Sequence, residues 1–293
     1  MTTSSNRENS LLFVGLNTID LQFLVSDFPA PNTKTKAKEN RIFAGGPAVN
    51  AAIAAAHLGG EVDLLTPIGE HTLTGFIVDD IRRRNVCIID PIAGEPSRPV
   101  FASIITTEQS GDRTIFSYHP ERRIDMTDRP AFDVRKYRLA LFDGFFPEMA
   151  VPIARQCREE GVVTVLDGGS WKPWLADLLP YIDIAVCSDD FTVPEGDRPD
   201  DVFAHLHAQG VDRAAITRGH RTILFSSGRG TGEIPIEPIA AVDTLGAGDV
   251  FHGAFAFYAA EGRAFEKALE MASKVAAHSC LTLGTRDWMK KPA

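Results

Sequence analysis

The stretch AVDTLGAGDVFHGAF, Ala241–Phe255, combines two carboxylates and a glycine-rich turn with the start of an apolar helix. Gly246 and Gly248 carry no Cβ, so the backbone there can adopt positive φ angles and a charged ligand can approach its N–H groups closely. From Asp249 onward the spacing of apolar residues predicts a helix, whose first turn has N–H groups without intrahelical acceptors. Because such a helix end attracts anions, the stretch predicts a site that handles phosphate.

Each carboxylate of this stretch has two interpretations. Asp249 could be the N-cap of the helix, or it could take a proton from a hydroxyl that attacks bound phosphate. Asp243 follows an expected strand that ends at residues 240–242, and it could either close a turn or support a cation. The stretch alone leaves these alternatives open.

The composition is typical of a soluble globular protein. The chain has 293 residues, of which 44% are hydrophobic and 24% charged, so it can bury a large core without disulfides or metal. A formal net charge of −9 argues against a nucleic-acid partner, and no apolar run is long enough to span a membrane. The polar first ten residues lack the apolar core of a signal peptide and predict a loose tail on a cytoplasmic protein. The cysteines lie too far apart for a metal cage and are expected to be reduced, mostly buried thiols: Cys87, Cys157, Cys187 and Cys280.

Strand and helix patterns alternate along most of the chain. Helices are expected after the glycines at 45–46 and over 76–84 and 150–161, between strands over 11–16, 61–69, 138–144, 162–169 and 182–188. This order predicts an α/β fold with a doubly wound, mostly parallel sheet, in which ligands bind beyond the carboxyl ends of the strands. Several polar residues fall at or just after such ends: Asp20, Asp143, Asp167, Ser188, Thr217 and Asp243.

Two segments break the alternation. Residues 19–43 contain two prolines and a basic run, and the segments VFASIITT and RTIFSYH predict a hairpin around Gly111 and Asp112. Together they could form a small β-sheet lid that excludes water from reacting phosphate, whereas the alternative is a simple surface hairpin. The expected large domain covers 11–16, 44–97 and 122–290, and the expected lid covers 17–43 and 98–121.

Several of these motifs together resemble the ribokinase-like, or PfkB-type, carbohydrate kinases. The family signature DTxGAGD matches Asp243–Asp249, and its double glycine followed by an asparagine matches Gly45, Gly46 and Asn50. An opening strand followed by an acid, Asp20, also matches, and the similarity extends over nearly the full length. Within the family, the sequence is most similar to ketohexokinase-like and sulfofructose kinase-like members.

The resemblance implies a ribokinase-like fold and an ATP-dependent kinase that phosphorylates a primary hydroxyl of a sugar, expected to be a ketose or a sugar derivative. It implies that Asp249 is the catalytic base and that the N–H groups of Gly246, Ala247 and Gly248 form an anion hole. It further implies Mg²⁺ as a cofactor, K⁺ near Asp243 and a homodimer formed through the lid. The implied sugar-binding residues are Asp20, Gly45, Gly46, Asn50 and, from the lid, Arg113. The implied ATP-binding residues are Ser188, Thr217, Gly219, Thr244, Gly246 and Gly248.

The sequence departs from the family pattern at three places. Pro47 replaces the asparagine that ketohexokinase-like proteins have after the double glycine, which puts fructose itself in question. Ser188 and Phe191 replace the Asn-x-x-Glu pattern found near magnesium, so Asp189 or Asp190 would have to act through water. The segment DGFFPE lacks the arginine expected of a sulfonate-binding kinase.

Two other functions are compatible with such a sheet. The first is a sugar-binding sensor that keeps the fold without phosphoryl transfer, favoured by the missing Asn-x-x-Glu pattern and opposed by the complete GAGD loop. The second is a dinucleotide-dependent dehydrogenase. The GxGxxG turn that it requires is absent after the first strand, where FVGLNTID stands.

Overall fold

The computed structural model describes residues 10–109, 111–120, 124–126 and 132–290, which form two β-sheets with helices. The larger sheet has nine strands in the order β13-β12-β11-β10-β9-β8-β1-β4-β5. It is parallel from β11 to β5, and β12 and β13 add an antiparallel edge. The strands are β1 (Ser10–Val14), β4 (Glu61–Leu65), β5 (Val86–Ile89), β8 (Leu139–Phe142), β9 (Val163–Gly168), β10 (Ile184–Ser188), β11 (Arg213–Arg218), β12 (Arg221–Ser227) and β13 (Gly230–Ile234).

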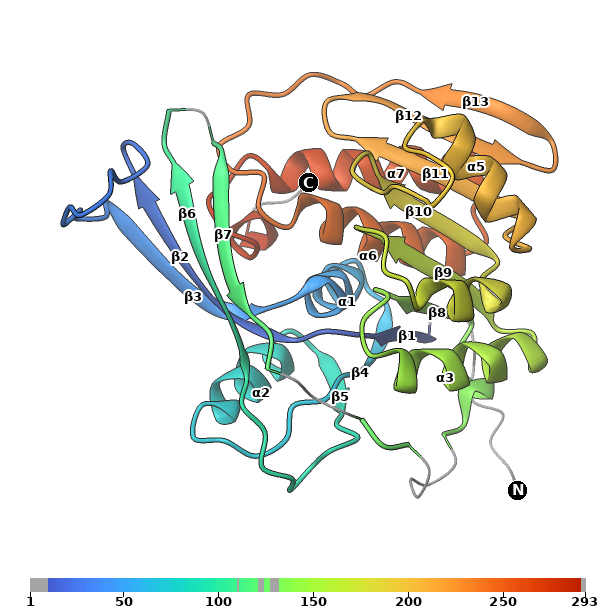
Figure 1. Cartoon of the computed structure of the whole chain (residues 1–293), viewed down its shortest axis with the longest axis horizontal. Helices are drawn as coiled ribbons and strands as arrows, with labels where there is room; N and C mark the ends of the chain where they lie inside the picture. Colours follow the sequence, from blue (N-terminus) through green and yellow to red (C-terminus); the bar gives the residue numbers. More distant parts are fainter. Residues whose placement is uncertain (1–9, 110, 121–123, 127–131, 291–293) are drawn as a thin grey trace.

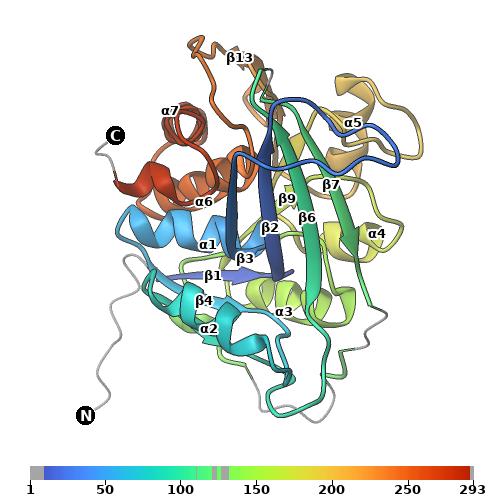
Figure 2. The same cartoon turned by 90° about the vertical axis from the view of Figure 1, so that its left-hand side faces the viewer.

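Helices cover both faces of this sheet (Figures 1 and 2). One face packs against α1 (Pro47–His57), α2 (Thr74–Arg82), α6 (Ala247–Ala260) and α7 (Phe265–Ser279). The other packs against α3 (Pro147–Glu159), α4 (Leu175–Leu178) and α5 (Pro199–Ala208). Alternate residues of β1 serve the two cores, with Leu11 and Phe13 in one and Leu12 and Val14 in the other. The predicted doubly wound α/β fold is therefore confirmed.

A second sheet projects from the large one (Figure 1). Its order is β3-β2-β6-β7, in which β2 and β6 are parallel and the two outer pairs are antiparallel. The strands are β2 (Thr18–Val25), β3 (Glu39–Gly45), β6 (Val100–Thr107) and β7 (Arg113–Tyr118). We call these four strands the lid sheet, and its β6–β7 hairpin is the one that the sequence predicts.

One expected strand is absent from the structure. Residues 240–242 form no strand, because β13 ends at Ile234 and the chain then runs as a loop. The N–H of Val242 donates to the carbonyl of Cys280 at 2.8 Å, so a single contact and not a ladder holds this segment. The polar tail up to residue 9 and the expected domain boundary at 121–122 lie outside the described residues. No helix in the described part of the chain is long and apolar enough to cross a membrane.

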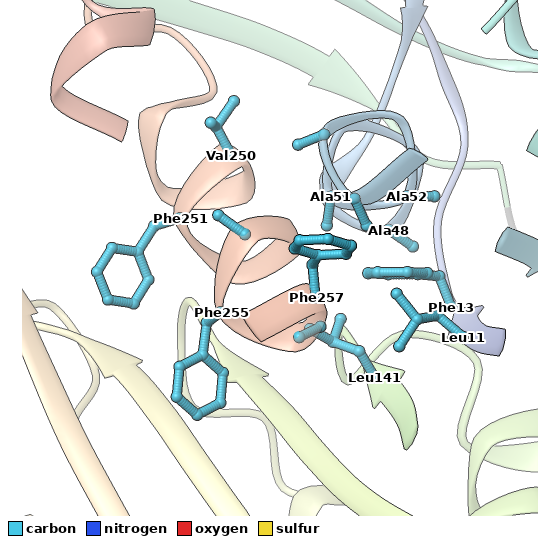
Figure 3. Packing of buried hydrophobic residues seen from close by; sticks show 14 of the residues in the cluster. Leu11, Phe13, Ala48, Ala51, Ala52, Leu141, Val250, Phe251, Phe255 and Phe257 are labelled. Atoms are coloured by element: carbon cyan, nitrogen blue, oxygen red, sulfur yellow. The ribbon is translucent and has the colours of Figure 1, made fainter. Parts of the chain in front are cut away.

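The contact between α1 and α6 brings two distant parts of the chain together. A Cβ added at Gly253 of α6 would lie 2.1 Å from the carbonyl oxygen of Ala51 in α1, so only glycine permits this approach. Figure 3 shows Ala48, Ala51 and Ala52 of α1 beside α6. Small residues on both helices thus set their separation, and with it the position of any side chain near the crossing.

We expect Gly253→Ala to lower the free energy of unfolding by about 1–3 kcal/mol, because the added methyl overlaps backbone and forces the helices apart. Gly75 is the matched control, since it is also helical and a Cβ there meets no atom within 4 Å. Urea unfolding of both variants checks this expectation. Equal stabilities of the Gly253→Ala and Gly75→Ala proteins would contradict it.

Candidate functional site

The glycine loop ends at the first turn of α6. Gly246 has a left-handed backbone with φ of 70° and is the N-cap, so Asp249 is the third helical residue. The interpretation of Asp249 as the N-cap is therefore wrong, as is a helix start at that residue. The N–H of Ala247 makes only a 3.3 Å bond to the carbonyl of Thr244. A Cβ at Gly248 would meet nothing within 4 Å, so the N-terminal end of α6 faces open space.

Asp249 contacts α1 through a short hydrogen bond. The amide Nδ2 of Asn50 donates to Asp249 Oδ2 at 2.7 Å, across a separation of 199 residues in sequence. Burial raises the pKa of Asp249 to about 7, and the negative charge of Asp167 adds to the rise, while the Asn50 hydrogen bond opposes it. A carboxyl with a pKa near neutrality is suited to accept a proton and release it again.

Two glycines make room for two further carboxylates. A Cβ at Gly45 would lie 1.9 Å from Asp20 Oδ2, and a Cβ at Gly15 would lie 2.1 Å from the carboxyl of Asp143. Asp20 accepts a hydrogen bond from Thr18 Oγ1 at 2.5 Å. Asp143 accepts from the N–H of Leu16 at 2.7 Å. Burial raises the pKa of both carboxyls to about 6.

Asp167 interacts electrostatically with Asp143 and with Asp249, and Asp249 also interacts with Asp20, so these four carboxyls form one acidic cluster. Asp167, at the end of β9, is 6% exposed and lies 3.5 Å from the buried ring of His252. The cluster therefore presents several hydrogen-bond acceptors beyond the carboxyl ends of the strands. This is where doubly wound sheets are expected to bind ligands.

Lys172 stands at one end of this cluster. Its Nζ donates to the carbonyl of Ser170 at 3.3 Å and lies 4.5 Å from the ring centroid of Phe145, which stacks on His119 from the lid side. Burial lowers the pKa of Lys172, while Asp143 and Asp167 oppose that change. A cation thus lies against the segment DGFFPE, although that segment itself contains none.

Asp243 is buried and accepts three N–H donors. Its Oδ1 accepts from Leu245 at 2.9 Å, and its Oδ2 accepts from Gly284 at 2.8 Å and from Gln22 Nε2 at 2.6 Å. Gln22 lies on β2 of the lid sheet, so this carboxylate connects the lid to the glycine loop. The Oε1 of Gln22 is buried without a partner among the described residues.

The remaining predicted residues are spread over the same edge of the sheet. Arg113 starts β7 and donates from Nη1 to Thr244 Oγ1 at 2.6 Å, so it lies beside the glycine loop and not against Asp20 or Asn50. Ser188 donates to the carbonyl of Gly169 at 2.8 Å, and Thr217 to that of Cys187 at 3.3 Å. Gly219 turns between β11 and β12 with φ of 62°, and a Cβ there would meet nothing within 4 Å. The structure thus joins Asp20, Gly45, Gly46, Asn50 and Asp249 in one place, and none of the hydrogen bonds above links Ser188, Thr217 or Gly219 to that place.

Sequence reasoning missed three side chains of this region. Lys172 follows a strand without any motif, and Gln22 alternates with apolar residues in β2, where it reads as solvent-facing. Arg286 follows the last long helix in the segment LGTRDW, yet its Nη1 donates to Asn50 Oδ1 at 2.8 Å. No local pattern marks these residues, because their contacts are formed with distant segments.

No three His, Cys, Asp or Glu side chains in the described ranges converge to hold a metal ion. At the end of β10, Asp189 forms an ion pair with Arg221. The neighbouring Asp190 is exposed.

Comparisons with known proteins agree with this geometry. The family model described as pfkB family carbohydrate kinase matches residues 8–292. Ribokinase from Bacillus subtilis (strain 168) is 25% identical over 257 residues, which cover 84% of each chain. Ketohexokinase from Mus musculus is 21% identical over 287 residues, which cover 93% of this chain and 96% of the relative. A solved structure of a putative ribokinase from Agrobacterium tumefaciens matches with a TM-score of 0.83 at 25% identity, covering 97% of this chain and 99% of its own.

The raised pKa of Asp249 has a consequence for stability. The folded protein holds a proton on this carboxyl between its ordinary value of 3.8 and about 7, whereas the unfolded chain has released it. Stability therefore falls as the pH rises through this window. We expect Asp249→Asn to be more stable than the wild type at pH 8, on the order of 4 kcal/mol, with the difference vanishing near pH 4.

Glu270 is the matched control, because its side chain is 37% exposed and hydrogen bonds from Lys267 and Lys274 lower its pKa. Replacement by Gln at this position should not stabilise the protein at pH 8. Chemical unfolding at both pH values provides the measurement. An Asp249→Asn protein that is no more stable than the wild type at pH 8 would disprove the raised pKa.

Proposed function

This chain belongs to the pfkB family of carbohydrate kinases and is a sugar kinase, and from that premise we propose that it transfers the γ-phosphate of ATP to a primary hydroxyl of a ketose or related sugar. The observation that supports this most strongly is the position of Asp249. Its carboxyl has a pKa of about 7 and lies one turn inside a helix that begins at a glycine loop. A base and an anion-binding helix end are therefore adjacent.

In the proposed reaction, Asp249 accepts the proton of the attacking sugar hydroxyl. The hydroxyl oxygen forms a bond to the γ-phosphorus as the bond from that phosphorus to the β–γ bridging oxygen breaks, and ADP leaves with the bonding pair. The proton bound to Asp249 is later released to water. A pKa near neutrality makes both the uptake and the release of this proton accessible.

The N–H groups of Gly246, Ala247 and Gly248 are proposed to bind the transferred phosphoryl group. They lie at the N-terminal end of α6, where the helix dipole favours negative charge. Arg113 donates to Thr244 in the same loop and would bring a lid cation to the phosphates. This arrangement stabilises charge where it develops in the transition state.

Sugar hydroxyls are proposed to bind Asp20 and Asn50, beside the backbone of Gly45 and Gly46. Carboxylates accept hydrogen bonds from hydroxyl groups, and the acidic cluster supplies several such acceptors. The relatives named ribokinase and ketohexokinase indicate a pentose or hexose. Pro47 has no side-chain amide that could donate a hydrogen bond to the sugar. Lys172 is a donor that could replace the asparagine expected at that position.

The adenine nucleotide is proposed to lie along Ser188, Thr217 and Gly219, with its phosphates toward Thr244 and Gly248. Gly219 and Gly248 leave open space at the positions of their missing side chains, which fits a ligand there. Mg²⁺ would bind together with ATP, coordinated by its phosphates, and would neutralise part of their charge. Because Asp189 is paired with Arg221, the exposed Asp190 is the acid at this strand end that would hold the hydrated ion.

A monovalent cation near Asp243 stays a prediction from the resemblance. The Oε1 of Gln22 is buried beside this carboxylate and accepts no hydrogen bond from the part of the chain that the structure describes, so it could serve as an oxygen ligand for such an ion. K⁺ there would lend positive charge to the loop that precedes the anion hole. A measured turnover that is the same in K⁺, Na⁺ and tetramethylammonium buffers would remove this prediction.

The lid sheet is proposed to form a homodimer. In the register of the sheet, Phe101 pairs with Tyr118, Ser103 pairs with Phe116 and Leu21, and Leu21 pairs with Ile42, so these residues share one face. On this outer lid face Ile42, Phe116 and Tyr118 are 53%, 59% and 68% exposed. An exposed apolar sheet face beside a free edge strand favours pairing with a second copy.

Replacing Asp249 by Asn should lower turnover on the order of a hundredfold or more, because Asn cannot accept the proton. Sugar binding should change little, since the Asn50 amide still has an oxygen to bind. A panel of ketoses, aldoses, sugar acids and nucleosides, assayed for ATP-dependent phosphorylation, identifies the substrate for this comparison. Asp212→Asn, just before β11 at the opposite edge of the sheet, serves as the control.

Unchanged turnover in the Asp249→Asn protein would remove Asp249 as the base. If no member of the panel is phosphorylated by the wild type, the proposed reaction fails as a whole. Either outcome is clear from product formation followed by mass spectrometry.

For the dimer, Phe116→Asp should convert the protein to a monomer at micromolar concentration, because a buried charge opposes closure of an apolar interface. Leu73→Asp is the matched control, since Leu73 is 42% exposed and lies outside the lid sheet. Light scattering after gel filtration measures the mass. A monomeric wild type, or a Phe116→Asp protein that stays dimeric, would refute the lid interface.

A further inference from the structure

Arg286 lies between the end of α7 and the 3₁₀ helix η3 (Asp287–Lys290), and only 7% of it is exposed. Its Nη1 donates to Asn50 Oδ1 at 2.8 Å, and Asn50 Nδ2 in turn donates to Asp249 Oδ2 at 2.7 Å. Three residues, from the first turn of α1, the start of α6 and the segment after α7, thus form one hydrogen-bonded line. Arg286 does not itself touch the carboxyl of Asp249 in this arrangement.

The hydrogen bonds in this line can run in only one direction, from Arg286 to Asn50 and from Asn50 to Asp249. A guanidinium is a donor without acceptor atoms, so the end of the Asn50 amide that faces Arg286 must be the oxygen. The NH₂ end of the amide must then face Asp249. Without the arginine, the Asn50 amide could rotate and present its oxygen to a protonated Asp249, which would favour the protonated and inactive form of the base.

Other contacts hold Arg286 rigidly. Its Nη1 also donates to Thr285 Oγ1 at 2.9 Å, and Nη2 donates to the carbonyl of Ala44 at 2.5 Å. The guanidinium carbon lies 5.5 Å from the ring centroid of Phe43. Since Phe43 and Ala44 belong to β3, the arginine also fixes the strand that leads into the double glycine.

We propose that Arg286 is a positioning residue that fixes the orientation of the Asn50 amide and thereby keeps Asp249 in its proton-accepting form. The inference rests on the proposed function, because it takes Asp249 as the base. It assigns a role in the reaction to a residue that never contacts the sugar or ATP in the proposed arrangement.

The charges around this line are consistent with the assignment. Asp249 is influenced by Asp167 from β9, Asp20 from β2 and His252 from its own helix. Arg286 interacts electrostatically with Asp80 of α2, Arg84, Asp20 and also Asp249 itself, and its Nε lies 4.0 Å from Asp80 Oδ2. Burial lowers the pKa of Arg286 to about 10, so the guanidinium stays charged and donor-only at neutral pH.

The test is a ¹³C-NMR titration of the Asp249 carboxyl, which needs no substrate. Arg286→Met should move the titration midpoint of Asp249 up by about one pH unit. The variant loses the guanidinium that donates to Asn50, and with it the fixed orientation in which the Asn50 amide donates to Asp249. Arg286→Lys keeps a charged donor and should restore a midpoint close to that of the wild type. Arg84→Met removes a neighbouring positive charge without touching Asn50, and it should leave the midpoint unchanged.

A double-mutant cycle separates positioning from a simple charge effect. In an Asn50→Leu background there is no amide to orient, so adding Arg286→Met should move the midpoint by less than about a third of its shift in the wild-type background. An equal shift in both backgrounds, or no shift on Arg286→Met in a folded protein, would overturn the proposal. Circular dichroism at the titration temperature establishes that each variant is folded.

Kinetics with the sugar identified by the panel adds a second readout. Arg286→Met should lower kcat/KM about fivefold at pH 7 and hardly at all at pH 9, with KM for ATP nearly unchanged. A loss by the same factor at all pH values would indicate a purely structural role and would also overturn the proposal. If no sugar is phosphorylated, the proposed function fails while the NMR titration still decides the role of Arg286.

Discussion

The crossing of α1 and α6 is the constraint on which the site depends. The missing Cβ of Gly253 allows the carbonyl of Ala51 to approach α6 closely. Asn50 precedes Ala51 directly, and Asp249 lies about one helical turn before Gly253, so the same crossing sets the distance between the amide and the carboxyl. The packing of small residues in the core is thus also what aligns the groups that carry the proposed chemistry.

The candidate site also requires that the carboxylates of the acidic cluster lie close together with little access to water. Burial raises the pKa values of Asp20, Asp143, Asp167 and Asp249, and Arg286 and Lys172 supply positive charge at its two ends. Such a cluster costs stability, because each carboxyl loses hydration when it is buried. In the proposed function these carboxylates accept hydrogen bonds from sugar hydroxyls, so the cost in stability would lie in a site that trades stability for function.

Much of the fold was predictable because it is encoded locally. The alternation of apolar strands and amphipathic helices predicts the doubly wound sheet, and the glycine pattern predicts the turn that precedes α6. The expected strand before Asp243 was wrong, since a three-residue apolar run carries no periodicity that separates a strand from a loop pinned to Cys280. Arg286 could not be found, because its partner Asn50 lies 236 residues away and nothing in LGTRDW marks that contact.

Asp249 is proposed to be a base whose pKa lies close to neutrality: loss of hydration and the charge of Asp167 raise it, and the hydrogen bond from Asn50 limits the rise. The pH dependence of kcat/KM for the phosphorylated sugar tests it most directly. We expect a plateau above pH 8 and a tenfold fall per pH unit well below a midpoint of about 7. A kcat/KM that stays constant from pH 8 down to pH 5 would contradict it.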